Sequence, residues 1–200
     1  MPRSNFFRSL LLAFGVLMAA ACSADVAAPP PPDLSSTPFG TVSGSATDAT
    51  GMQFHALWWG QDLKNPISVS KTIDVSGGTI TIPETGLTVS FPEGAVTAPL
   101  TVTITADLRY VAYKMEPSGT QFLKDVTVTQ LFDATQLSGT PLRSTIYAAY
   151  IADDSISLSG SVPAIEVEPS KTIFSATAPN VPEAQVWIIR HFSRYMLASG

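Results

Sequence analysis

Short runs in which a hydroxyl residue alternates with an apolar residue are the strongest constraint on how this chain folds. Such runs occupy residues 79–82, 87–91, 100–105 and 126–129. A period of two places the apolar side chains on one face and the threonines on the other, which is typical of a β-strand with one buried face. Because no stretch of ten or more residues shows a helical period, the sequence predicts an all-β chain.

Turn-forming residues separate these runs at short intervals. Glycines at 77–78 precede the first run, and proline with glycine follows at 83–86, 92–94 and 117–119. Less regular apolar runs predict further strands at residues 52–59, 146–151, 171–176, 185–190 and 193–198. Short strands at this spacing indicate a sandwich or barrel. We expect a single antiparallel β-sandwich over residues 41–200.

Composition limits the function classes that this fold can serve. The chain has 200 residues, enough for one ordinary domain, and its net charge is -5 from 11 basic and 16 acidic residues. An acidic balance argues against nucleic-acid binding, which normally needs a basic face for the phosphates. Two histidines and one cysteine leave little for a multi-ligand zinc site, so we expect neither a metal site nor a cofactor.

The first 21 residues have the pattern of a secretory signal. Arg3 and Arg8 supply a positive start, and an apolar stretch at residues 10–20 follows that is too short to span a bilayer. The stretch ends in Ala19-Ala20-Ala21 and then in Cys22, the only cysteine of the chain. This ending resembles the lipobox of bacterial lipoproteins. The alternative is an ordinary secretory signal in which Cys22 is incidental.

The lipobox resemblance implies a membrane anchor. In that family the cysteine thiol is diacylated, the peptide is cut before the cysteine, and the new amine is acylated as well. Three acyl chains exceed the two signals that stable anchoring needs. Ser23 after the cysteine implies export to the outer membrane of a Gram-negative cell. Residues 22–40 are rich in Pro, Ala and Ser and predict a disordered tether between the lipid and the folded domain.

The strand region resembles the ZU-5 domain. The matching stretches are GGTITIP at 77–83, FPEGAV at 91–96, EPSGTQF at 116–122 and VTV at 126–128. The resemblance covers residues 71–135, with a further match at HFSRY near the end of the chain, but Asp125 stands where that family often has proline. It implies a sandwich-like fold that is used mostly for protein contacts.

The tripeptide His191-Phe192-Ser193 suggests a reaction. In some ZU-5 proteins, and in some unrelated self-processing proteins, the chain cuts itself at this tripeptide. The resemblance implies that the Ser193 hydroxyl attacks the Phe192 carbonyl, that His191 takes the hydroxyl proton, and that water hydrolyses the ester. Residues two apart in a regular strand lie about 6.6–7 Å apart along the axis, so the reaction requires a bend or bulge at Phe192.

The alternative for this tripeptide is a histidine and a serine that hydrogen-bond at a strand break. A regular strand would place Trp187, Ile189, His191 and Ser193 on one face and Ile188, Arg190, Phe192 and Arg194 on the other. A cut before Ser193 would also free only residues 193–200, which has little obvious purpose.

The pair Trp58-Trp59 offers a third interpretation, in which a tryptophan stacks on sugar in a carbohydrate-binding module. Adjacent strand residues face opposite ways, so we expect one of the two in the core and one on the surface. Together these features predict a lipid-anchored envelope protein that presents a ZU-5-like sandwich to an envelope protein or glycan. We expect no turnover enzyme; the alternatives are self-processing between Phe192 and Ser193 and sugar binding.

Overall fold

The computed structural model describes residues 41–200 and arranges them as strands and connecting loops. The predicted signal peptide, Cys22 and the tether at 22–40 lie outside the described residues. The strands are β1 (Thr47–Asp48), β2 (Gln53–Ala56), β3 (Ser68–Ile73), β4 (Gly78–Ile82), β5 (Leu87–Phe91), β6 (Leu100–Ala106), β7 (Ala112–Glu116), β8 (Gln121–Leu131), β9 (Ile146–Ile151), β10 (Ser161–Pro163), β11 (Glu166–Glu168), β12 (Ser170–Phe174), β13 (Pro182–His191) and β14 (Arg194–Ser199). Residues 41–200 contain no helix, and hence none with the length and hydropathy of a membrane span.

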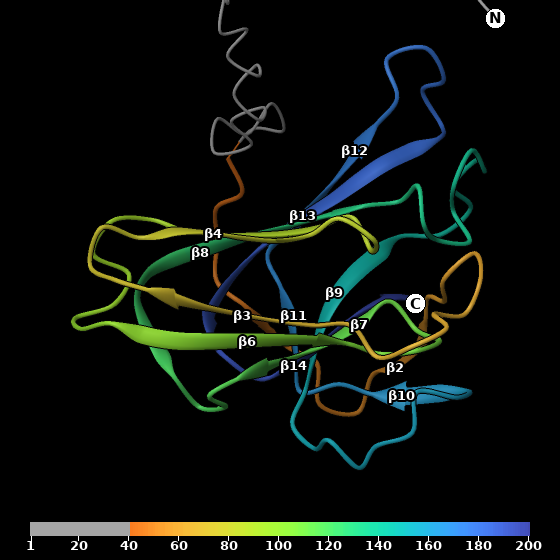
Figure 1. Ribbon diagram of the computed structural model, residues 1–200. Helices are drawn as coiled ribbons and strands as arrows, with labels where there is room; N and C mark the ends of the chain where they lie inside the picture. Colours follow the sequence, from red (N-terminus) through yellow and green to blue (C-terminus); the bar gives the residue numbers. More distant parts are fainter. Residues whose placement is uncertain (1–40) are drawn as a thin grey trace, which may run out of the picture. The chain divides into compact units, whose positions relative to one another are not determined.

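The strands form two antiparallel sheets. The nine-stranded sheet has the order β1-β11-β9-β14-β7-β6-β3, with β2 paired to β14 and β10 paired to β2. The five-stranded sheet has the order β12-β13-β8-β5-β4. Figure 1 shows them as two layers, with β4 and β8 in one and β3 and β6 in the other. The predicted all-β antiparallel sandwich is confirmed.

The hydroxyl and apolar alternation determines which face of each strand is buried. In the β4–β5 hairpin Ile80 pairs with Val89, and both side chains are buried. On the outer face of the nine-stranded sheet, hydroxyl side chains pair across β3 and β6, as in Ser70 with Thr103 at 2.7 Å. Apolar side chains thus fill the space between the sheets, while a ladder of hydroxyl pairs covers an outer surface.

One hydrogen-bond network crosses the main core. The Tyr113 hydroxyl on β7 donates to Gln130 Oε1 on β8 at 2.6 Å, which joins the two sheets. The Gln130 amide nitrogen donates in turn to the carbonyl oxygens of Thr85 and Leu131. Burial raises the pKa of Tyr113 well above its ordinary value, so this side chain stays a neutral donor.

A second, smaller core covers the outer face of the nine-stranded sheet. Met196 of β14 and Ala149 of β9 pack there against Phe54 of β2, Val162 of β10 and the loop residue Leu158. The other face of β14 contributes to the main core between the sheets. The last strand of the described chain is therefore buried on both faces and lies between β9 and β7.

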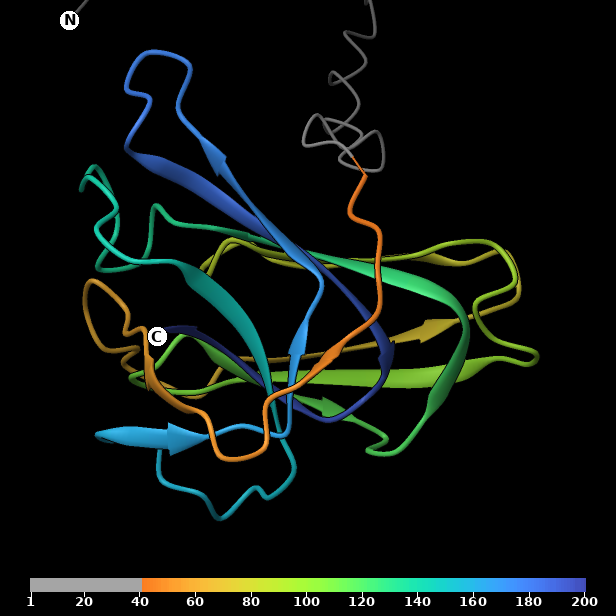
Figure 2. The same ribbon diagram turned by 180° about the vertical axis from the view of Figure 1, so that it is seen from behind.

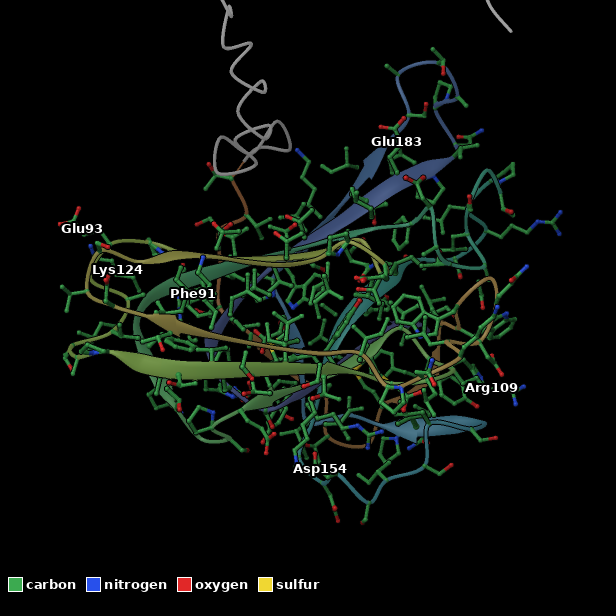
Figure 3. All side chains as sticks on the ribbon, in the orientation of Figure 1. Phe91, Glu93, Arg109, Lys124, Asp154 and Glu183 are labelled. Atoms are coloured by element: carbon green, nitrogen blue, oxygen red, sulfur yellow. The ribbon has the colours of Figure 1, made fainter. Side chains whose placement is uncertain are left out.

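The turn at 92–94, which carries part of the ZU-5 resemblance, is tied to the neighbouring strand. Lys124 Nζ on β8 donates to the carbonyl oxygen of Glu93 at 2.6 Å, and Figure 3 shows the two residues at the same end of the molecule. Asp125, at the position where the family often has proline, accepts a hydrogen bond from Arg190 Nε at 2.7 Å. The departure from the family pattern thus supplies an ion pair between β8 and β13.

A break in the pairing of β13 with β8 corrects the predicted strand faces near the end of the chain. The register of β13 against β8 shifts between Ile189 and His191. Trp187, Ile189 and Phe192 all belong to the main core, whereas Arg190 and His191 line a surface pocket. The predicted alternation, with His191 on the Trp187 face and Phe192 opposite, is therefore wrong. Between these two pairs β13 advances by two residues and β8 by five, so the regular ladder is interrupted and the alternation of strand faces does not continue past Arg190.

Candidate functional site

The predicted tripeptide lies where the chain passes from one sheet to the other. His191 ends β13 in the five-stranded sheet, and β14 of the nine-stranded sheet begins two residues after Phe192. The Phe192 ring is fully buried and meets the rings of Phe91 and Phe122 edge to face, with centroids 6.0 and 4.7 Å away. This aromatic cluster holds the chain in place where it passes from one sheet to the other. The regular strand ends here, and self-processing would need such a break at Phe192.

Backbone hydrogen bonds hold both sides of the Phe192–Ser193 peptide. The Phe192 carbonyl oxygen accepts a hydrogen bond from Gly119 N–H at 2.8 Å, and the Phe192 N–H donates to the Thr120 carbonyl oxygen at 2.8 Å. The Ser193 carbonyl oxygen accepts from Met115 N–H at 2.9 Å. The peptide that self-processing would cut is therefore held rigidly, with one donor already on its carbonyl oxygen.

The imidazole of His191 is engaged elsewhere. Its Nδ1 lies 3.3 Å from the Tyr195 hydroxyl, and its Nε2 lies 3.8 Å from Glu166 Oε2. Within residues 41–200 no hydrogen bond joins His191 to Ser193. The structure brings the two predicted reaction partners close in the chain but directs the imidazole toward β11 instead of toward the serine hydroxyl.

A group that the sequence analysis missed surrounds this imidazole. Glu166 and Glu168 of β11 and His191 each offer one ligand atom, and these three atoms lie within 4.8 Å of one another. They line a pocket of about 140 Å³ whose rim includes Gly44. Figure 2 shows the segment at residues 41–48 beside β11, at the edge of the sheet. The sequence signal was the Glu-x-Glu spacing, which places two carboxylates on one strand face.

Glu168 is unusual within this group. It is only 5% exposed, and its Oε1 has no hydrogen-bond partner among the described residues. Burial, and secondarily the charge of Glu166, raises the pKa of Glu168 to about 7, while the charge of Arg190 opposes the shift. The carboxyl therefore lacks the donors that normally accompany a buried acidic group.

The guanidinium of Arg190 is already occupied by other groups. It pairs with Asp125, and its Nη2 donates to the Gly44 carbonyl oxygen at 3.3 Å. The hydrogen bond and the charge of Asp125 raise the pKa of Arg190 further above its ordinary value. The arginine thus holds the segment before β1 against β13 and makes no hydrogen bond or salt bridge to either glutamate.

The two tryptophans separate as expected. Trp59 is 1% exposed, donates from Nε1 to the Asp107 carbonyl oxygen at 2.8 Å, and packs edge to face on Tyr113. Trp58 is 51% exposed and forms a β-bridge with Tyr110. Of this pair, Trp58 presents a surface for stacking, because Trp59 is enclosed in the main core.

No family model and no curated protein matches this chain. The ZU-5 resemblance therefore rests on the quoted sequence stretches. Of the predicted site residues, the structure places the His191 tripeptide and the tryptophans, whereas Cys22 lies outside the described residues.

Proposed function

We propose that this chain is a lipid-anchored envelope protein that presents a ZU-5-like β-sandwich for contact with an envelope protein or glycan. The observation that carries the proposal is the sequence Ala19-Ala20-Ala21-Cys22 at the end of an apolar stretch with a positive start. The rigid strand framework that follows the Pro-rich segment supports it, because a domain held on a tether acts through its surface.

An exposed aromatic patch supports the contact role. Trp58 and Leu108 are 51% and 44% exposed, and Trp58 pairs with Tyr110 across a β-bridge. The guanidinium of Arg109 lies 6.0 Å from the centre of the Tyr110 ring. Aromatic and arginine side chains are enriched at binding surfaces, where their large areas desolvate on contact. We therefore place the contact surface at Trp58 and residues 108–110.

The anchoring claim is tested by fractionation of cells that express the full chain. The wild-type chain is expected in the membrane fraction and the Cys22→Ser variant in the soluble fraction. Ser23→Ala is the matched control, because it changes a neighbouring residue and leaves the acylation site intact. A wild-type chain that is soluble, or a Cys22→Ser variant that stays in the membrane, contradicts the anchor.

The contact claim has a separate readout. A glycan array and a pull-down from an envelope extract are compared for the wild type and for Trp58→Ala. Binding that Trp58→Ala removes, and that a change at the exposed Leu123 leaves intact, supports the patch. Sugar binding would favour the carbohydrate-module interpretation over protein contact. Equal binding by the wild type and Trp58→Ala contradicts the assignment of this surface.

Self-processing between Phe192 and Ser193 is the second candidate, and the hydrogen bond from Gly119 N–H to the Phe192 carbonyl oxygen favours it. In this reaction the Ser193 hydroxyl oxygen bonds to the Phe192 carbonyl carbon and the peptide C–N bond breaks. The hydroxyl proton passes to His191, whose imidazole must first turn from β11 toward Ser193, and from there to the freed amine; water then hydrolyses the ester. The Gly119 donor would stabilise the developing oxyanion.

Mass spectrometry under denaturing conditions tests this second candidate. Denaturation is essential, because β14 pairs with its neighbours on both sides and would hold the cut piece in place. Cleavage removes roughly 0.9 kDa, the eight residues from Ser193 to Gly200. Ser193→Ala is expected to remain whole. An intact wild-type chain rules the reaction out.

A further inference from the structure

The two glutamates of β11 face an imidazole that comes from the opposite sheet. Glu166 and Glu168 are two residues apart on a strand and therefore point to the same side. Glu166 pairs across the ladder with Tyr150 of β9, which pairs with Tyr195 of β14. The His191 ring at the end of β13 meets the Tyr150 ring edge to face, with the two centroids 4.9 Å apart. The two carboxylates and the imidazole thus come together between a strand of one sheet and the end of a strand of the other.

The hydrogen bonds of Tyr195 determine which nitrogen of His191 carries the proton. The Tyr195 hydroxyl donates its one proton to the His191 carbonyl oxygen at 2.8 Å. Its oxygen, 3.3 Å from Nδ1, can then only accept, so the network assigns the imidazole proton to Nδ1. Nε2 of the ring lies 3.8 Å from Glu166 Oε2, which is longer than a hydrogen bond.

The pocket therefore brings two carboxylates and an imidazole together. Each offers one ligand atom within 4.8 Å of the others, and the buried Oε1 of Glu168 has no hydrogen-bond partner among the described residues. Such an arrangement is unfavourable unless a cation lies between the groups. The guanidinium of Arg190 does not serve, because Asp125 and the Gly44 carbonyl oxygen bind it.

We propose that Glu166, Glu168 and His191 form a binding site for a divalent zinc ion that joins the two sheets. One imidazole nitrogen and two carboxylate oxygens are ligands that zinc accepts, with a fourth position open to water from the pocket. An imidazole ligand and a small number of oxygens disfavour calcium and magnesium, which prefer six or more oxygen ligands or a retained water shell.

The distances and charges fit this ion. Tetrahedral zinc with bonds of 2.0–2.1 Å needs ligand atoms about 3.3 Å apart. The present separations of up to 4.8 Å close by rotation of the two glutamate side chains. With both carboxyls ionised around a bound ion, the two glutamates supply a charge of -2 that matches a dication, while Arg190 is paired with Asp125. The Tyr195 contact to Nδ1 is the outer hydrogen bond that metal-bound histidines usually have. A zinc ion at this place would differ from the sequence-based expectation of no metal.

Calorimetric titration with zinc chloride tests the proposal. The sample is the full chain carrying Cys22→Ser, which removes the thiol as a competing ligand, after treatment with a chelator. One zinc ion per chain is expected. Glu168→Gln and His191→Gln should weaken binding at least about tenfold, and Tyr195→Phe, which keeps all three ligands, should weaken it about tenfold through the lost outer hydrogen bond.

Matched controls separate this site from adventitious binding. His55→Gln changes the only other histidine, on β2, and Glu183→Gln changes an exposed glutamate of β13; neither should alter the affinity. In case a site variant fails to fold, NMR of the chain with all three ligand residues intact gives a second readout. Zinc should shift the His191 imidazole nitrogens and leave those of His55 in place. Failure to bind zinc, or binding that is lost in His55→Gln and kept in His191→Gln, overturns the proposal.

Discussion

The hydrogen bond between Tyr113 and Gln130 gives the sharpest test of how the two sheets are held together. Both groups are buried, with Tyr113 2% exposed and Gln130 fully enclosed. Tyr113→Phe removes the donor and leaves Gln130 Oε1 in the core without a partner. Because an unsatisfied buried acceptor loses its hydration without compensation, this change should lower the free energy of unfolding by about 1–3 kcal/mol.

Substitution of Gln130 should lower the free energy of unfolding by more than Tyr113→Phe does, and the effects of the two substitutions should be coupled. Gln130→Leu leaves the Tyr113 hydroxyl without its acceptor and removes the donor to the Thr85 and Leu131 carbonyl oxygens. In the double variant no orphan remains from the Tyr113–Gln130 bond itself. The double variant should therefore be more stable than the sum of the single changes predicts, by about 1–2 kcal/mol.

Urea denaturation of the four proteins measures this coupling. Tyr147→Phe is the matched control, because it removes a hydroxyl from a half-buried tyrosine of β9, and it should change stability by less than about 0.5 kcal/mol. Single changes that add within about 0.5 kcal/mol would refute the reasoning, because they would show that the two side chains do not act as a pair.

Four further changes test the packing around the candidate sites and the geometry of one turn. Phe192→Ala should lower the free energy of unfolding by about 3–5 kcal/mol, because it empties the aromatic cluster at the sheet crossing. Trp59→Ala should lower the free energy of unfolding by a similar amount, whereas Trp58→Ala should change it by less than about 0.5 kcal/mol. Equal effects would contradict the assignment of Trp59 to the core and Trp58 to the surface. Gly77→Ala should cost more than about 1 kcal/mol, because its φ is +82° and the new Cβ would lie 2.2 Å from the Phe91 carbonyl oxygen; wild-type stability would contradict the turn geometry. Thermal or urea unfolding measures all of these changes.

The strands that the sequence predicted share a strong apolar signal. The alternating runs became β4, β5, β6 and the middle of β8, and the run at 146–151 coincides with β9. In these strands burial of one face matches the period of the sequence, so local pattern and tertiary packing agree.

The strands that the sequence did not predict lack that signal for identifiable reasons. β3 is the edge of the nine-stranded sheet and is mostly exposed, so that only Ile73 of its six residues is fully buried. β7 contains Ala, Tyr, Lys, Met and Glu, none of which is β-branched. β11 has three residues, too few for any period to show. Their positions come from pairing with strands far away in the chain.

The candidate site was predictable only in part. The separation of Trp58 from Trp59 follows from a local rule about strands, whereas a break at Phe192 was only a condition that self-processing requires. The position of His191 on the pocket side accompanies the irregular register of β13 against β8, which the sequence of one strand does not encode. The approach of Glu166 to His191 likewise depends on the packing of two sheets.

Denaturing mass spectrometry of the protein extracted from membranes tests the central claim most directly. A lipid-anchored protein has Cys22 as its first residue and a mass that exceeds the peptide mass by three acyl chains. The same spectrum shows whether the last eight residues from Ser193 remain attached. A chain that begins after Cys22, or that carries an unmodified Cys22, would contradict the lipid anchor on which the proposed function depends.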